Sequence, residues 1–105
     1  MMAKFCHVGV PVKKKRPKEM YVAGGKVHIT DPGASPFGFE YLRFEKGSPL
    51  PRKLQKEPHI AYEVEDLKAA LKGRDVIVRP FDATPTLRVA FIVVDGVAVE
   101  LMQKV

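Results

Sequence analysis

The stretch that most constrains this chain is "PHIAYEVEDLKAALKG", residues 58–73, where the apolar pattern changes from a strand period to a helix period. Residues 59–64 alternate, which places Ile60, Tyr62 and Val64 on one face of a strand. Residues 65–73 then follow the spacing of a short amphipathic helix that ends at Gly73. We therefore expect the large apolar side chains of this strand to pack beneath a helix and its polar side chains to line the opposite surface.

Three more strand patterns follow this helix. They cover residues 75–81, 87–95 and 97–105. Asp95-Gly96, between the last two, is a strong signal for a tight hairpin. The second half of the chain, about residues 58–105, is therefore predicted to be one βαβββ unit.

The first half, about residues 3–46, can be laid on the same template. Residues 4–12, 26–31 and 37–45 predict strands, and residues 13–25 occupy the helix position before two glycines. One of the three strands expected after the helix is missing or merged. The connector, residues 47–57, lies in a stretch with three prolines that is expected to carry neither a central strand nor a helix interior. We predict one α+β domain over residues 1–105, built from two βαβββ modules of which the first is shortened.

Composition restricts the classes of protein. No apolar run approaches the roughly 18 residues of a membrane-spanning helix, and the N-terminus lacks the pattern of a secretory signal, so we expect a cytoplasmic protein. The single cysteine allows neither an internal disulfide nor a thiolate cluster for a metal. A net charge of +6 indicates attraction to anions, and the densest basic run is "VKKKRPKE" at 12–19.

Two histidines and two glutamates recur at matching positions of the two halves. His7 lies in the first strand of the first half, as His59 does in the second, and Glu40 and Glu100 lie in the matching last strands. A pseudo-twofold repeat brings equivalent positions face to face, and buried carboxylates need compensation that a divalent cation can supply. We expect the four side chains to converge and bind one divalent metal ion: zinc, nickel, cobalt, manganese or ferrous iron. A one-residue slip in register would instead bring Tyr41 or Phe39 to that face.

Other residues carry weaker signals. His28 has no counterpart in the second half and is expected on the surface of a strand. Leu42 and Met102 share strand parity with the two glutamates and are candidates for the floor of a pocket, or for ordinary core. Arg43 and Arg88 could bind a substrate carboxylate, although an exposed arginine is the commoner outcome.

The motifs "HVGV", "PHIAYEVEDLKAAL" and "GVAVELMQ" resemble the vicinal oxygen chelate superfamily, which includes glyoxalase I, methylmalonyl-CoA epimerase, extradiol dioxygenases, and fosfomycin and bleomycin resistance proteins. The resemblance is strongest over residues 58–71 and 89–103, and it is nearest in motif to the glyoxalase I and epimerase branches. It implies paired βαβββ modules that form a cupped mixed sheet around a metal, with His7, His59 and Glu100 as ligands. The fourth ligand position falls on Glu40, which favours the glyoxalase and epimerase branches.

The chemistry that the resemblance implies is proton abstraction next to a metal-chelated carbonyl. Glu100 and Glu40 are both candidates for the catalytic base. The expected substrate is small, oxygen-rich and anionic, and the expected assembly is a homodimer that binds neither nucleic acid nor membrane. Two alternatives come from other classes. The first is a non-catalytic small-molecule-binding protein of the bleomycin-resistance type, and the second is a basic nucleic-acid-binding module, whose binding would fall steeply with salt.

Overall fold

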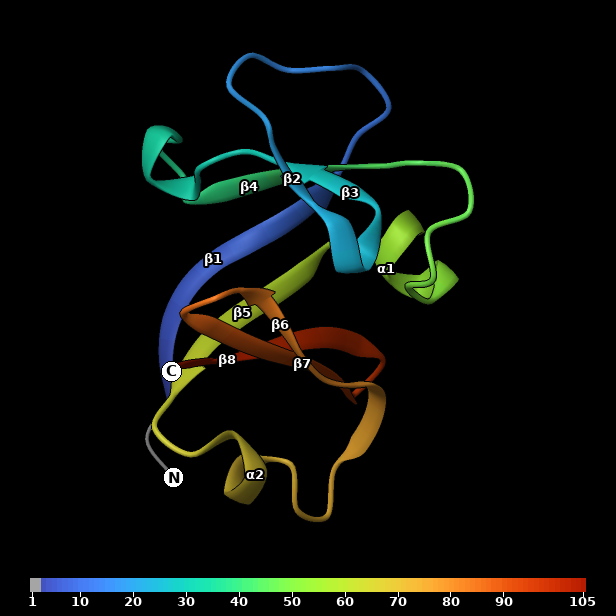
Figure 1. Ribbon diagram of the computed structural model, residues 1–105. Helices are drawn as coiled ribbons and strands as arrows, with labels where there is room; N and C mark the ends of the chain where they lie inside the picture. Colours follow the sequence, from blue (N-terminus) through green and yellow to red (C-terminus); the bar gives the residue numbers. More distant parts are fainter. Residues whose placement is uncertain (1–2) are drawn as a thin grey trace.

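The computed structural model describes residues 3–105, so the first two residues of the predicted domain lie outside the described residues. Eight strands form one sheet in the order β2-β3-β4-β1-β5-β8-β7-β6 (Figure 1). The strands are β1 (Ala3–Pro11), β2 (Met20–Val22), β3 (Val27–Ile29), β4 (Phe39–Phe44), β5 (His59–Val64), β6 (Asp75–Thr84), β7 (Leu87–Val94) and β8 (Val97–Lys104). The helices are α1 (Arg52–Lys56) and α2 (Leu67–Ala70), with two 3₁₀ turns, η1 (Ala23–Gly25) and η2 (Pro32–Ala34). Within residues 3–105, no helix is long and apolar enough to cross a membrane.

The strand order has a twofold pattern about its centre. β1 and β5 pair antiparallel in the middle, β1 pairs parallel with β4, and β5 pairs parallel with β8. The remaining strands follow outward in the same sequence on both sides, β3 then β2 and β7 then β6. The predicted α+β fold with a cupped mixed sheet is therefore confirmed, and the two halves pair within one chain.

The second half folds as its pattern predicts. α2 begins after Asp66, whose carboxylate accepts a hydrogen bond from the amide of Ala69. The chain leaves the helical turns through Gly73, which has a φ of 71°. Asp95 and Gly96 form the hairpin between β7 and β8 with φ values of 50° and 81°, as a two-residue turn with left-handed backbone requires.

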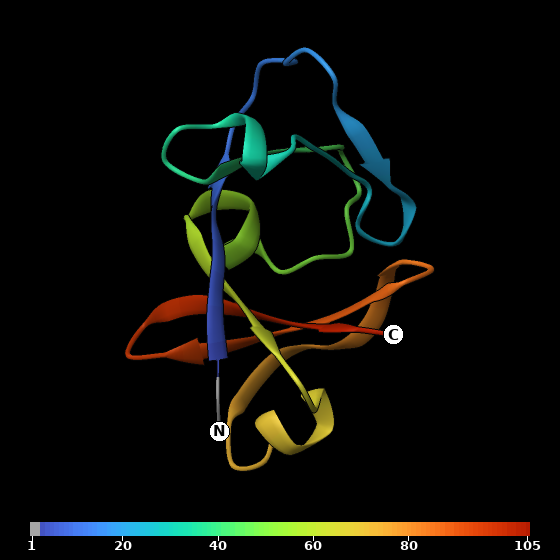
Figure 2. The ribbon, with the colours of Figure 1, turned by 90° about the vertical axis from the view of Figure 1, so that its left-hand side faces the viewer.

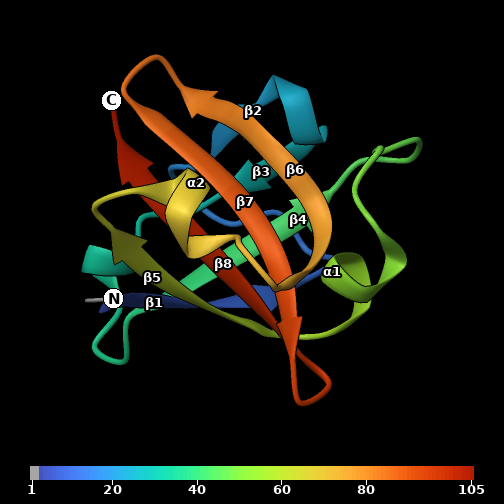
Figure 3. The same ribbon diagram turned by 90° about the horizontal axis from the view of Figure 1, so that it is seen from below.

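A buried core lies between α2 and the outer face of the second half (Figure 3). Its fully buried members come from β5, α2, β7 and β8: Val64, Leu67, Ala70, Ala90, Ile92 and Leu101. Burying a leucine or isoleucine side chain here contributes about 1.5–3 kcal/mol each. This core packs α2 against the outer face of the strands, so the inner face of the same strands is free to carry polar groups.

The first half differs from the prediction because it has no helix in the position of residues 13–25. Residues 12–19 form a loop, and β2 and η1 follow it. Four consecutive cations repel one another, and Pro17 lacks the amide donor that a helix interior needs, so this segment gains nothing from helix formation. The strand that the sequence left missing is β2, in which Tyr21 pairs with His28 of β3.

The connector also differs from the prediction, because it carries the short helix α1. Pro51 lies immediately before the helix, at a position where the missing amide costs nothing, and Pro58 follows it. The six residues between these prolines are enough for one helical turn. Leu54 in this turn is 1% exposed and belongs to the core cluster beneath the cup, so the helix is anchored by one side chain.

Candidate metal centre

The two histidines lie next to each other on the inner face of the cup. His7 is in β1 and His59 is in β5, and in the antiparallel register His7 pairs with Ala61 while Gly9 pairs with His59. The ring centroids are 5.8 Å apart with an angle of 74° between the planes. His7 is 5% exposed and His59 1%. The twofold relation between the halves therefore brings the imidazoles together, as the sequence predicted.

Gly9 makes room for the ring of His59. A Cβ atom at position 9 would overlap Cε1 and Nε2 of that ring. On another side the ring of Phe91 meets His59 edge to face, with centroids 5.2 Å apart. The glycine of "HVGV" was the sequence signal for this close approach, and sequence reasoning took it only as part of a small-or-apolar pattern.

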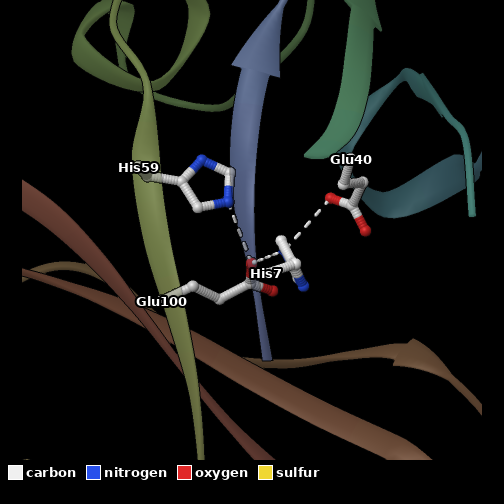
Figure 4. A group of neighbouring side chains, drawn as sticks. All are labelled: His7, Glu40, His59 and Glu100. Atoms are coloured by element: carbon white, nitrogen blue, oxygen red, sulfur yellow. Dashed lines mark hydrogen bonds and ion pairs between the residues drawn. The ribbon is translucent and has the colours of Figure 1, made fainter. Parts of the chain in front are cut away.

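The two glutamates flank the histidines from the neighbouring parallel strands (Figure 4). In the register of β1 and β4, Glu40 pairs with Gly9. In the register of β5 and β8, Glu100 pairs with Ala61. Each half therefore supplies one histidine and one carboxylate through the same pair of strands, and the alternative register that would bring Tyr41 inward is not the one observed.

The four side chains form one cluster. Oε1 of Glu100 lies 3.0 Å from Nε2 of His59 and 3.4 Å from Nε2 of His7. Oε1 of Glu40 lies 3.4 Å from Nε2 of His7. One donor atom from each residue can be chosen so that all four lie within 4.8 Å of one another. Glu100 thus contacts both imidazoles, whereas Glu40 contacts one.

The charges within the cluster shift its protonation. Burial lowers the pKa of His7, but the carboxylates of Glu100 and Glu40, each 3.4 Å from its Nε2, outweigh burial and raise its pKa to about 10. Burial raises the pKa of Glu100, but the two histidines outweigh burial and hold its pKa below its ordinary value. In the absence of a metal, the site therefore holds a proton on His7 at neutral pH.

The cluster fits a divalent metal ion. Nε2 of His7 is buried, has no hydrogen-bond partner in the described part of the chain, and lies between two carboxylates. Two imidazole nitrogens and two carboxylate oxygens, without a thiolate, suit zinc, nickel, cobalt, manganese or ferrous iron. Nδ1 of His59 also has no partner among residues 3–105, so the ring is oriented by Gly9 and Phe91 rather than by a hydrogen bond at that atom.

A cavity of about 360 Å³ lies against the cluster, and His7, Glu40 and Glu100 form part of its lining. The rest of the lining is mainly apolar and comes from both halves, with Val22, Val27 and Leu42 from the first and Phe81, Val89 and Met102 from the second. Leu42 and Met102 therefore lie beside the site, as their strand parity predicted. Small ligand sites typically combine apolar walls with a few convergent polar groups, and this cavity has that composition.

The remaining sequence candidates lie elsewhere. Arg43 binds Glu19, with Nη2 2.7 Å from Oε1, and Arg88 binds Asp82, with Nε 3.0 Å from Oδ1. Neither arginine lines the cavity, so neither is placed to receive a substrate carboxylate there. His28 lies outside the cluster, as expected.

Two solved structures are similar to this fold. A hypothetical protein from Bacillus halodurans matches with a TM-score of 0.73 and 21% identity, over 100% of this chain and 96% of that one. Methylmalonyl-CoA epimerase from Mycobacterium tuberculosis matches with a TM-score of 0.65 and 19% identity, over 97% of this chain and 88% of that one. Neither a protein-family model nor a curated protein matches the sequence. At these identities the comparisons establish the fold.

Proposed function

We propose that this chain is a metal-dependent lyase or isomerase of the vicinal oxygen chelate type, which removes a proton next to a carbonyl in a glyoxalase-like or epimerase-like reaction. The observation that carries the proposal is the cluster of His7, Glu40, His59 and Glu100 beside an apolar cavity, with four donor atoms within 4.8 Å. The fold shared with an epimerase supports the reaction class. A bound divalent ion would act as a Lewis acid, polarising the carbonyl and stabilising the negative charge that develops in the transition state.

The two glutamates have different roles in this proposal. Glu100 contacts both histidines, and its lowered pKa makes it a weak base and a good permanent ligand. Both glutamates line the cavity, but Glu40 contacts only His7, so its carboxylate is the one that is free to accept the substrate proton. We assign proton transfer to Glu40 and metal retention to His7, His59 and Glu100.

The side chains that line the cavity restrict the class of substrate. Because the lining away from the cluster is mainly apolar, a substrate would direct its oxygens towards the glutamates and histidines and bury an apolar portion between the two halves. The apolar walls also exclude water from Glu40 when the cavity is filled, which strengthens its interaction with the substrate proton. Hemithioacetals of 2-oxoaldehydes and branched acyl thioesters have this combination of groups.

The test is hydrogen–deuterium exchange at the carbon next to the carbonyl, followed by NMR in D₂O with nickel-, zinc-, cobalt- or manganese-loaded protein. We expect the wild type to exchange at least one hemithioacetal or acyl-CoA epimer, and Glu40→Gln to lose exchange while keeping the metal. His28→Ala is the matched control, since this histidine lies outside the cluster, and it should exchange as the wild type does. Exchange that persists in Glu40→Gln would contradict the assignment of the base.

The second candidate is a non-catalytic protein that binds a small molecule in the same cavity. The apolar composition of the walls favours it, because such a lining holds a ligand without any chemistry. Saturable ligand binding without proton exchange, in protein shown to contain the metal, would select this candidate.

The proposal also includes a homodimer, in line with the resemblance to glyoxalases and epimerases, and a cytoplasmic location, as the sequence pattern predicted. Light scattering coupled to size-exclusion chromatography measures the mass directly. Two chains per particle are expected, and a mass of about 11.7 kDa at micromolar concentration would contradict the dimer.

A further inference from the structure

The loop at residues 12–19 covers the outer face of the first half, at the opposite end of the molecule from α2 (Figure 2). In the second half this outer face is closed by α2. In the first half no α-helix takes this place, and a hollow of about 520 Å³ remains over β4. Phe39 and Tyr41 form its base, because they alternate with Glu40 and therefore face away from the metal cluster.

The side chains around this hollow suit an anion. Arg16 and Lys18 line it, together with Ser35 and Thr30, whose hydroxyls can donate hydrogen bonds. The guanidinium of Arg16 lies 3.6 Å from the ring centroid of Tyr41. This cation–π contact holds the arginine over Tyr41 inside the hollow.

The cations of the loop are not neutralised by the acids around them. Glu19, the acid nearest in sequence, is held by Arg43 through two of that side chain's nitrogens and accepts the backbone amide of Arg16. Asp31 lines the hollow, but its carboxylate caps η2 through the amide of Gly33. Among the described residues, the lysines and arginines that form ion pairs all lie outside this loop: Arg43, Lys53, Arg88 and Lys104.

We propose that this hollow binds the phosphoester group of a small ligand, with Arg16 and Lys18 as the cationic contacts. An arginine can bind phosphate oxygens through its planar fork, and a nearby lysine adds a compact positive charge. The hollow is an open depression of about 520 Å³ lined by two cations and two hydroxyls, which is large enough for the phosphoester group of a small molecule. This site is separate from the metal cluster and does not depend on the proposed reaction.

Three residues connect the hollow to the metal cavity. Lys18, Thr30 and Asp31 line both of them. A ligand held by its phosphoester in the hollow would therefore lie at the rim of the cavity that contains Glu40. The geometry links the two sites at this rim.

The test is an NMR titration of ¹⁵N-labelled, metal-free protein with ADP, and in parallel with adenosine, which lacks the phosphates. We expect ADP to shift the backbone amides of residues 16–18, 30–31 and 34–41 in a saturable way, and adenosine to produce no such shifts. The double variant Arg16→Gln/Lys18→Gln should bind ADP at least about tenfold more weakly, because two charged hydrogen-bond donors are lost.

The matched control is Lys68→Gln/Lys72→Gln, which removes the same charge beside α2 and should leave ADP affinity unchanged. His59→Ala disturbs the metal cluster and should also leave it unchanged, which separates this proposal from the proposed function. Equal weakening by the two double variants would overturn the site, because binding would then follow net charge. Equal shifts with adenosine, or tighter binding of an unrelated DNA duplex that falls steeply with salt, would overturn it as well.

Discussion

The two halves of the sheet contribute the same types of side chain to the site, although they differ in the amount of regular structure around it. In the second half, three strands of 10, 8 and 8 residues and a covering helix surround the strand that carries His59. In the first half, β2 and β3 have three residues each and no helix covers them. Each half nevertheless supplies one histidine and one carboxylate. The comparison teaches that ligand positions depend on the inner pair of strands in each half, and that the outer elements can be shortened without moving them.

The largest expected effect is on stability and belongs to the second half. Leu67→Ala removes a side chain that is 2% exposed at the centre of the core beneath α2, and should lower the free energy of unfolding by about 2–5 kcal/mol. Val27→Ala, in the small core of the first half, removes fewer buried atoms and should cost about 1–2 kcal/mol. Urea unfolding at 25 °C measures both. Equal losses in the free energy of unfolding would contradict the claim that the core of the second half contributes more to stability than the core of the first.

The next effect separates the two carboxylates. Glu100→Gln removes the group that contacts both histidines and should weaken metal binding on the order of 100-fold or more. Glu40→Gln removes a group with one such contact and should weaken it about tenfold. Competition with a chromogenic chelator measures both affinities. Losses of the same size would show that the halves hold the metal equally.

A third comparison uses the residues that pair with the histidines. Gly9→Ala places a Cβ in the ring of His59 and should cost about 1–3 kcal/mol of stability together with a loss of metal affinity. Ala61→Gly, at the equivalent position in the second half, should cost about 1 kcal/mol and leave the metal bound. Thermal unfolding with and without metal distinguishes them. A Gly9→Ala variant with the unfolding temperature and the metal affinity of the wild type would contradict the close approach of the His59 ring to Gly9.

The smallest effect concerns the proton on His7. Its raised pKa means that metal binding must displace a proton between about pH 6.5 and 10, so affinity should rise about tenfold per pH unit in that window. The raised pKa of His7 also stabilises the metal-free fold. This contribution is fully present below pH 6.5, the pKa of histidine in the unfolded chain, and it is lost as the pH rises through about 10. Calorimetry at pH 7, 8 and 9 in buffers of different ionisation enthalpy measures the released proton. A pH-independent affinity would contradict the shift.

The sequence predicted the second half well because its signals are local. Alternation over residues 59–64, the cap at Asp66 and the Asp95-Gly96 turn each act within a few residues. The four-residue cluster was predictable for another reason, namely that a repeated unit places equivalent residues face to face. The first half was predicted less well, since a short strand of three residues has almost no pattern, and the charge run was assigned to a helix position that only the template required.

Tertiary contacts explain the rest. The helix α1 forms because Leu54 reaches the core beneath the cup, a contact between the connector and both halves that no local signal records. The role of Gly9 depends on a ring 50 positions along the chain. The hollow over Phe39 and Tyr41 arises from the absence of a helix, and absence of an element is visible only once its neighbours are in place.

The most direct test of the central claim is the metal content of protein purified without a histidine tag, measured by mass spectrometry of the elements, in the wild type, His59→Ala and Glu100→Ala. One divalent ion per chain in the wild type, with a sharp loss in both variants, is the predicted result. The matched control His28→Ala should retain the ion. A wild type that takes up no ion after incubation with nickel, zinc, cobalt and manganese would contradict the claim that His7, Glu40, His59 and Glu100 form a metal centre.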